Sequence, residues 1–103
     1  MSTSASITVK TYDGIRGDFF VPNNGMDKND ILRYFREIAT ELRGDVRPRR
    51  LPEAIIAFAC LGSVDGYGWI LIGEDDDVDY AWQITIGPRG GCTIRGGRTK
   101  EGK

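Results

Sequence analysis

Carboxylates in one short segment are the residues whose type and spacing come closest to a chemical site. Five acidic side chains fall within six positions: Glu74, Asp75, Asp76, Asp77 and Asp79. Such oxygen-rich clusters can bind calcium, but an EF-hand loop spaces alternating ligands over about twelve residues, with a central glycine and a final glutamate. Here the acids are adjacent. The segment therefore predicts either a solvated turn or an acidic contact with a basic partner, and no metal site.

The residues that common catalytic mechanisms need are scarce. The chain has no histidine, so the usual general base for a serine or cysteine nucleophile is missing, together with the commonest zinc ligand. Its glycines do not form a phosphate-binding loop, because no Lys-Ser or Lys-Thr pair follows them. We therefore expect no enzymatic activity, no cofactor and no bound metal.

The two cysteines, Cys60 and Cys92, lie far apart in the sequence. Cys60 belongs to the most apolar stretch and is expected to be a small core residue. Cys92 follows a glycine pair in a predicted turn, where its thiol can be exposed. The first residues show no export signal, which favours free thiols in a reducing compartment and a cytoplasmic location.

Basic residues form a second group of candidate contacts, in a connector and in the C-terminal region. They are Arg43, Arg47, Arg49, Arg50, Arg89, Arg95, Arg98, Lys100 and Lys103. Such groups bind phosphate, and an Arg-Gly-Gly triplet occurs twice, at 89–91 and 95–97, as in flexible RNA-binding segments. No aromatic side chain lies among them to stack on bases. Nucleic-acid binding, with Arg47, Arg49, Arg50, Arg89, Arg95 and Arg98 as its contacts, is therefore the alternative prediction.

The formal net charge of −1 conceals a separation of charge along the chain. Residues 65–79 contain six acidic side chains and no basic one, whereas residues 80–103 contain five basic side chains and one acidic one. Separated charges speed encounters with an oppositely charged surface. The pattern thus indicates a binding role.

Aromatic side chains flank the acidic segment on two predicted strands. Tyr67 and Trp69 alternate on one strand, Tyr80 and Trp82 on the next, so the members of each pair share a face. Tryptophan and tyrosine are enriched at binding hot spots. A small domain also needs such side chains for its core. Both roles are open for these four residues.

The N-terminal half predicts a hairpin followed by a helix. Residues 6–12 alternate apolar and polar side chains, Asp13-Gly14 is typical of a turn, and residues 19–21 form the returning strand. Asp27 is a suitable N-cap for a helix over 28–43, and Gly44 ends it. The apolar stripe of this helix consists of Ile31, Leu32, Phe35, Ile38 and Leu42.

The C-terminal half predicts further strands. The apolar run 54–61 allows a buried strand or a helix, and we favour the strand; residues 67–73, 80–86 and 92–95 form the others. The order ββαββββ with short later connections predicts an α+β domain. Its antiparallel sheet has about five or six strands, and the helix covers one face. Residues 1–97 form a single domain, residues 98–103 a flexible polar tail, and no stretch is long enough to cross a membrane.

Part of the chain resembles the ubiquitin-like β-grasp family. Residues Ile7 to Gly14 (ITVKTYDG) and the helix after them are similar to the start of that fold, and the resemblance covers residues 6–43. The string Ile94-Arg95-Gly96-Gly97 is similar to a ubiquitin-type end with a removable extension. The resemblance implies conjugation through Gly97 after cleavage. The strands predicted over 53–86 depart from the β-grasp order.

Together these patterns favour a small non-enzymatic protein-binding module. We expect an inhibitor or accessory protein, of the mobile-element, antitoxin or immunity kind, that engages a basic surface of a partner protein. Its contacts would be the acidic residues of 74–79 and the aromatic strands. The alternatives are a nucleic-acid-binding accessory protein and a ubiquitin-like modifier processed at Gly97.

Overall fold

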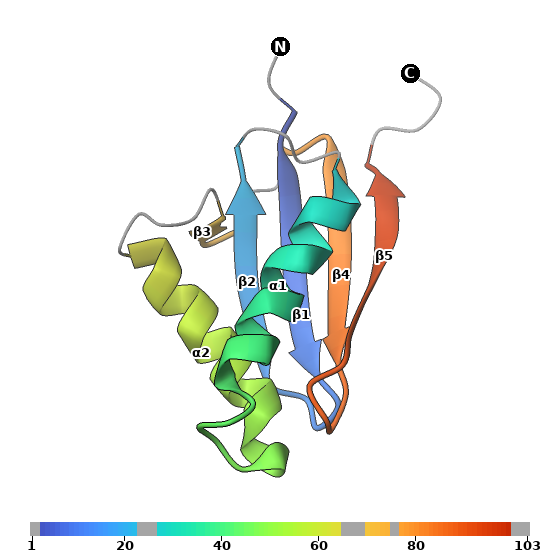
Figure 1. The fold of residues 1–103 in the computed structure, drawn as a ribbon. Helices are drawn as coiled ribbons and strands as arrows, with labels where there is room; N and C mark the ends of the chain where they lie inside the picture. Colours follow the sequence, from blue (N-terminus) through green and yellow to red (C-terminus); the bar gives the residue numbers. More distant parts are fainter. Residues whose placement is uncertain (1–2, 23–26, 65–69, 75–76, 100–103) are drawn as a thin grey trace.

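Two helices pack on one face of a five-stranded sheet (Figure 1). The computed structural model describes residues 3–22, 27–64, 70–74 and 77–99, with side chains left undescribed at 62–64. The elements in chain order are β1 (Ala5–Thr11), β2 (Arg16–Val21), α1 (Lys28–Leu42), the 3-10 helix η1 (Pro48–Arg50), α2 (Leu51–Val64), β3 (Leu71–Ile72), β4 (Tyr80–Ile86) and β5 (Cys92–Arg98). The mixed α+β class is confirmed. No helix of the described residues is long and apolar enough to cross a bilayer.

The strand order is β3-β2-β1-β4-β5, and the sheet is mixed. β1 and β4 are parallel neighbours, in a register that pairs Ile7 with Trp82 and Val9 with Ile84. All other neighbouring strands are antiparallel. The prediction of a purely antiparallel sheet was therefore wrong. β3 pairs with β2 at one edge of the sheet, so the chain must pass to the other side of β1 before β4 begins. The short connection between β3 and β4 therefore does not form a hairpin, because these two strands are not neighbours in the sheet.

The N-terminal hairpin is confirmed. β1 and β2 are antiparallel, and the N–H of Thr11 donates to the carbonyl of Ile15 at 2.8 Å. Gly14 has a φ of +97°, which glycine adopts without steric cost. This explains why the Asp-Gly pair was a reliable turn signal.

The predicted helix over 28–43 is confirmed as α1. Its N-cap is Asp27, whose carboxylate accepts from the N–H of Asp30 at 3.2 Å. Phe35 is fully buried and makes edge-to-face contacts with Phe19 of β2, at 5.8 Å between ring centroids, and with Tyr34, at 5.3 Å. The apolar stripe thus attaches α1 to the sheet.

Substituting the N-cap should weaken the protein measurably. Asp27→Ala leaves the first-turn N–H groups without this acceptor, and we expect the free energy of unfolding to fall by about 1 kcal/mol. Asp27→Asn keeps an acceptor and should stay within a few tenths of the native value. Urea denaturation checks both. Equal stability of Asp27→Ala and Asp27→Asn would show that the cap does not stabilise α1.

Residues 54–61 form part of helix α2, so the favoured strand was wrong and the helical alternative is correct. Ile55, Ile56 and Ala59 are buried, yet Phe58 and Leu61 are 40% and 62% exposed. Because apolar residues also occupy the outer side, the run lacks the periodicity that separates a helix from a buried strand. Two helices cover the sheet where one was predicted.

No helix of the described residues lies on the opposite face of the sheet, which we call the open face (Figure 1). One row of side chains crosses this open face from β2 to β5: Asp18, Thr8, Gln83 and Arg95. Arg95 Nε donates to Gln83 Oε1 at 3.1 Å. The helix-covered face is apolar and the open face polar, as period-two alternation requires.

Candidate functional site

The acidic segment is only partly within the described residues, which exclude Asp75 and Asp76. Glu74 and Asp77 are exposed. Asp79 is half-buried, and its carboxylate accepts from the N–H of Ser4 at 3.1 Å. Its backbone N–H also donates to the Ser4 carbonyl, and its carbonyl accepts from the N–H of Thr99. Asp79 therefore joins the start of β1 to the end of β5.

The structure describes two of the four aromatic residues that were predicted as binding contacts. Trp82 is 6% exposed and lies on the helix-covered face of β4, so it belongs to the core. Tyr80 is half-buried and stacks on it, with ring centroids 5.6 Å apart and planes 10° apart. Tyr67 and Trp69 lie outside the described residues. The core role is thus the one that the structure supports for Trp82.

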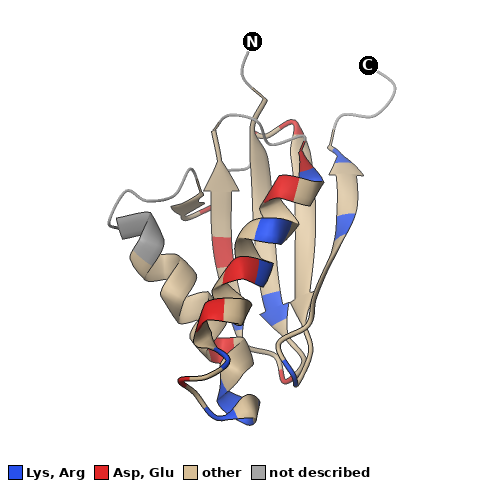
Figure 2. Ribbon diagram, in the orientation of Figure 1, with Lys and Arg blue, Asp and Glu red and all other residues tan. Residues whose placement is uncertain are grey.

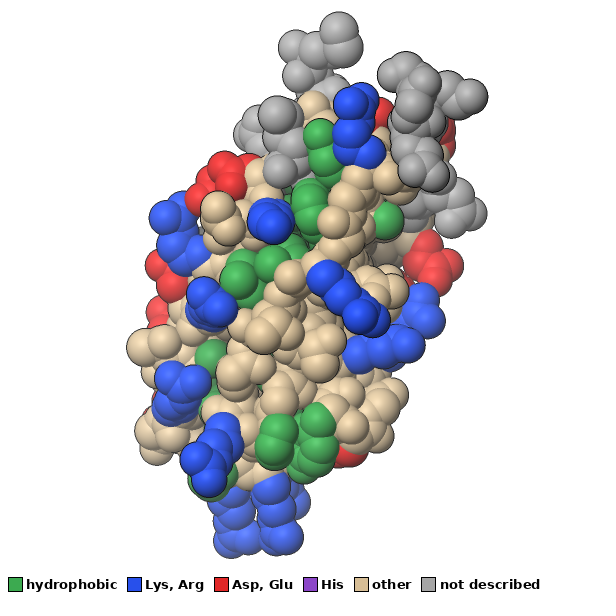
Figure 3. Space-filling model, turned by 90° about the vertical axis from the view of Figure 1, so that its right-hand side faces the viewer, with side chains coloured by type: hydrophobic (Ala, Val, Ile, Leu, Met, Phe, Trp, Pro, Cys, Tyr) green, Lys and Arg blue, Asp and Glu red, His purple; other side chains and the backbone are tan. Residues whose placement is uncertain are grey.

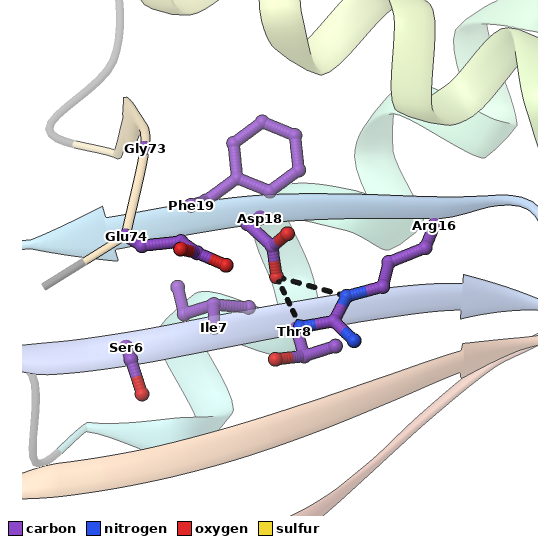
Figure 4. A pocket seen from close by; sticks show the side chains of 8 residues that line it. All are labelled: Ser6, Ile7, Thr8, Arg16, Asp18, Phe19, Gly73 and Glu74. Carbon is purple, nitrogen blue, oxygen red and sulfur yellow. Dashed lines mark hydrogen bonds and ion pairs between the residues drawn. The ribbon is translucent and has the colours of Figure 1, made fainter. Parts of the chain in front are cut away.

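A polar hollow of about 120 Å³ opens on the uncovered sheet face beside β3 (Figure 4). The carboxylates of Asp18 and Glu74 and the hydroxyl side chains of Ser6 and Thr8 line it, together with Arg16. Sequence reasoning did not single out Asp18, which lies in β2. Alternation with the buried Phe19 was the signal that could have placed it.

This hollow has a weak charge. Arg16 donates from Nε and Nη2 to Asp18 Oδ1, at 3.1 and 3.0 Å, and so neutralises that carboxylate. No group of three or more His, Cys, Asp or Glu side chains within the described residues can hold a metal ion. The hollow offers the Glu74 carboxylate to a cationic group. Because Asp18 is already paired, this does not amount to two free carboxylates for acid–base chemistry.

Of the basic side chains that the sequence singled out, Lys100 and Lys103 lie outside the described residues, and the predicted nucleic-acid contacts come from three segments that adjoin in the fold. Arg95 and Arg98 belong to the edge strand β5, Arg89 to the turn between β4 and β5, and Arg47, Arg49 and Arg50 to η1 and the residue before it (Figure 2). Arg89 and Pro48 line one pocket, so the turn and η1 are neighbours. Figure 3 shows basic side chains along the whole length of one side of the molecule, with acidic ones near its margins. We call the surface formed by these six arginines the basic face.

The arginines of the basic face lack acidic partners. Among the described residues, the ion pairs are Arg16–Asp18 and Arg33–Asp30, and neither arginine belongs to the predicted set. Arg95 has a neutral partner, Gln83. The charges on this face are therefore not compensated within the described structure, and their mutual repulsion favours binding of an anion.

Sequence reasoning missed Arg36, a residue of α1 that does not belong to its apolar stripe. Its guanidinium reaches β5 and donates to the carbonyl of Cys92 from Nε at 3.3 Å and from Nη2 at 3.1 Å. Arg36 and Arg43 lie seven positions apart, so they project from the same side of α1. That spacing is the signal that could have joined Arg36 to the basic set.

The cysteines are placed the other way round from the expectation. Cys92 is 4% exposed and Cys60 is half-buried, and both thiols are free. Burial raises the pKa of Cys92, although Arg36 and Arg43 oppose part of that shift. Burial also raises the pKa of Cys60. Cys92 alternates with the outward Thr93, so the strand pattern overrides the turn that precedes it.

The two Arg-Gly-Gly triplets are structured. Gly90 has a φ of +84° in the β4–β5 turn, Gly96 has a φ of +132° in β5, and Gly97 pairs with Ala81. The predicted processing point after Gly97 lies within β5, and the strand continues to Arg98. Thr99 then donates its N–H to Asp79, so the described chain stays attached beyond residue 97, where the polar tail was predicted to start. No family model matches the chain, and no curated protein or solved structure matches it significantly.

Proposed function

We propose that this protein is a non-enzymatic nucleic-acid-binding protein that contacts the phosphate backbone through its basic face. The observation that carries the proposal is the set Arg47, Arg49, Arg50, Arg89, Arg95 and Arg98. These side chains come from three segments that adjoin one another, η1, the β4–β5 turn and the edge strand β5 (Figure 2), and none makes an ion pair with a described residue. Phosphates are the natural partners of such groups because a guanidinium donates two parallel hydrogen bonds to one phosphate.

The extent of the basic face supports a long anion over a small one. Arginines occur from η1 at one end of the sheet, through the β4–β5 turn, to Arg98 at the other end of β5 (Figures 2 and 3). A nucleic acid presents phosphates at regular intervals and can occupy all of them. Contacts of this kind position a backbone and carry no sequence information. We therefore expect weak sequence preference.

The acidic-contact hypothesis has less support. Trp82 is in the core, Asp79 is used in internal hydrogen bonds, and the remaining described acids of the segment are Glu74 and Asp77. An inhibitor that binds a basic protein surface stays a prediction. The absence of histidine and the pairing of Asp18 with Arg16 support the non-enzymatic part of the proposal.

Charge removal from the basic face should weaken nucleic-acid binding and reduce its salt dependence. We expect Arg95→Gln/Arg98→Gln to lower affinity for a mixed-sequence oligonucleotide roughly tenfold per arginine at about 50 mM salt. The slope of log K against log salt should fall by about 0.9 per lost phosphate contact on a duplex and by about 0.7 on a single strand. Fluorescence anisotropy across a salt series measures both quantities.

The matched control is Arg16→Gln/Arg33→Gln, which removes the same charge from two arginines that already form ion pairs, with Asp18 and Asp30. It should leave the slope close to that of the native protein. If the native protein binds neither DNA nor RNA at low salt, the proposed function is wrong. An equal loss in both double variants would show that net charge, and not the basic face, determines binding.

A further inference from the structure

Two adjoining pockets lie between α1, the β4–β5 turn and the start of α2. The first has a volume of about 400 Å³ and is lined by Arg36, Thr40, Arg43, Gly90, Gly91 and Thr93. The second has a volume of about 320 Å³ and is lined by Arg43, Val46, Pro48, Leu51 and Arg89. Because Arg43 lines both, we treat them as one site, the arginine groove.

The arginine groove is positively charged and contains no carboxylate. Arg36, Arg43 and Arg89 line it, and none of them forms an ion pair with a described residue. Neither pocket has an aspartate or glutamate in its lining. Three like charges around a shared concavity repel one another, and an anion in the first pocket would relieve that repulsion.

Arg36 is held in place before any ligand binds. Its two hydrogen bonds to the Cys92 carbonyl use Nε and one N–H of Nη2. A guanidinium has five N–H donors, so three remain for a ligand. A fixed donor loses little side-chain entropy on binding, which makes the first pocket a prepared site for a phosphate.

The second pocket has apolar residues in its lining. They are Val46, Pro48 and Leu51, of which Leu51 is 3% exposed. The β4–β5 turn lies so close to Leu51 that a Cβ at Gly90 would be 2.4 Å from Leu51 Cδ2. Arg43 and Arg89 complete the lining, and planar guanidinium groups stack on nucleobases. The pocket thus suits a flat heterocycle next to a phosphate.

We infer that the arginine groove binds one unpaired nucleotide of a nucleic acid, with its phosphate at Arg36 and Arg43 and its base against Val46, Pro48 and Leu51. This inference rests on the proposed function, which concerns only contacts with the phosphate backbone of the nucleic acid. It adds a site for a base, since phosphate contacts alone would not need an apolar pocket. Inorganic phosphate would fill only the first pocket. A duplex keeps its bases stacked and must flip one out to fill the second. The preferred ligand is therefore single-stranded.

Three oligonucleotides of equal length test the groove on the full-length protein: a single strand of thymidylates, a blunt mixed-sequence duplex, and an abasic strand with the same phosphates. Electrostatics alone favours the duplex, whose charge density is higher. We expect instead that the thymidylate strand binds at least tenfold tighter than either of the others, since base stacking adds about that much affinity. Fluorescence anisotropy at about 50 mM salt gives the three affinities.

Arg43→Gln supplies the second test, with Arg50→Gln as the matched variant outside the groove. Arg43→Gln should weaken binding of the thymidylate strand roughly tenfold, and Arg50→Gln clearly less. Circular dichroism confirms that both variants are folded. Equal affinities for thymidylate and abasic strands, or equal losses in the two variants, would overturn the groove and leave the proposed function standing. Failure of the native protein to bind any of the three would overturn both.

Discussion

Replacing Gly96 by alanine is expected to destabilise the protein by about 4 kcal/mol, the sum of backbone strain and overpacking. Gly96 has a φ of +132°, which side chains other than glycine rarely adopt. A Cβ at this position would lie 2.1 Å from the carbonyl oxygen of Ala81 and 3.1 Å from Trp82 Cα. Both are backbone atoms of β4, so the clash cannot be relieved by a side-chain rotation, and β5 must move away from the sheet.

Gly97→Ala is the control, one residue further along the same strand. Nothing lies within 4 Å of a Cβ built there, and its backbone is not in the left-handed region. We expect stability equal to or slightly above the native value, because alanine restricts the unfolded chain. Thermal unfolding should show a fall of roughly 20 °C for Gly96→Ala and almost none for Gly97→Ala. Similar transition temperatures would mean that β5 does not pass Ala81 as closely as described.

Phe35→Ala should cost about 3–5 kcal/mol of unfolding free energy, the usual range for an aromatic side chain removed from a core. Phe35 is fully buried and contacts the rings of Phe19 and Tyr34. Its loss leaves a cavity between α1 and β2 that the sheet cannot collapse to fill. The urea midpoint should shift strongly while the slope of the transition stays constant.

The same substitution at Phe58 provides the comparison. Phe58 is 40% exposed on α2, so Phe58→Ala loses less buried area and should cost about 1 kcal/mol. The contrast tests the burial of the two rings. If Phe58→Ala were the more damaging change, Phe58 would not be the more exposed of the two side chains.

Local signals in the sequence predicted the elements well where a pattern was periodic or a turn needed a particular residue. Asp13-Gly14 marked the hairpin, and the N-cap Asp27 marked the start of α1. They failed at 54–61, where apolar residues on every side of α2 removed the period. They also gave no information about the parallel pairing of β1 with β4, because strand order depends on which surfaces α2 and β3 occupy.

The candidate site shows the same division. The six arginines of the basic face were visible as basic clusters in the sequence, but the sequence did not show that the β4–β5 turn lies beside η1, with Gly90 against Leu51. Arg36 looked like an ordinary solvent-exposed helical residue. Only its contact with the Cys92 carbonyl, between segments distant in sequence, makes it part of a site.

The parallel pairing of β1 with β4 has a consequence for how the chain folds. Ser4 and Asp79, which bond at the start of this pairing, are separated by 75 positions, so the central contact of the sheet closes a very long loop. Pairing between segments so distant in sequence slows folding relative to local contacts, because the loop entropy is lost before the contact is made. During synthesis, β1 and β2 must wait for residues 80–98 before the sheet can close. The basic face needs β5 in its place, so it cannot be complete before residues 92–98 have been synthesised.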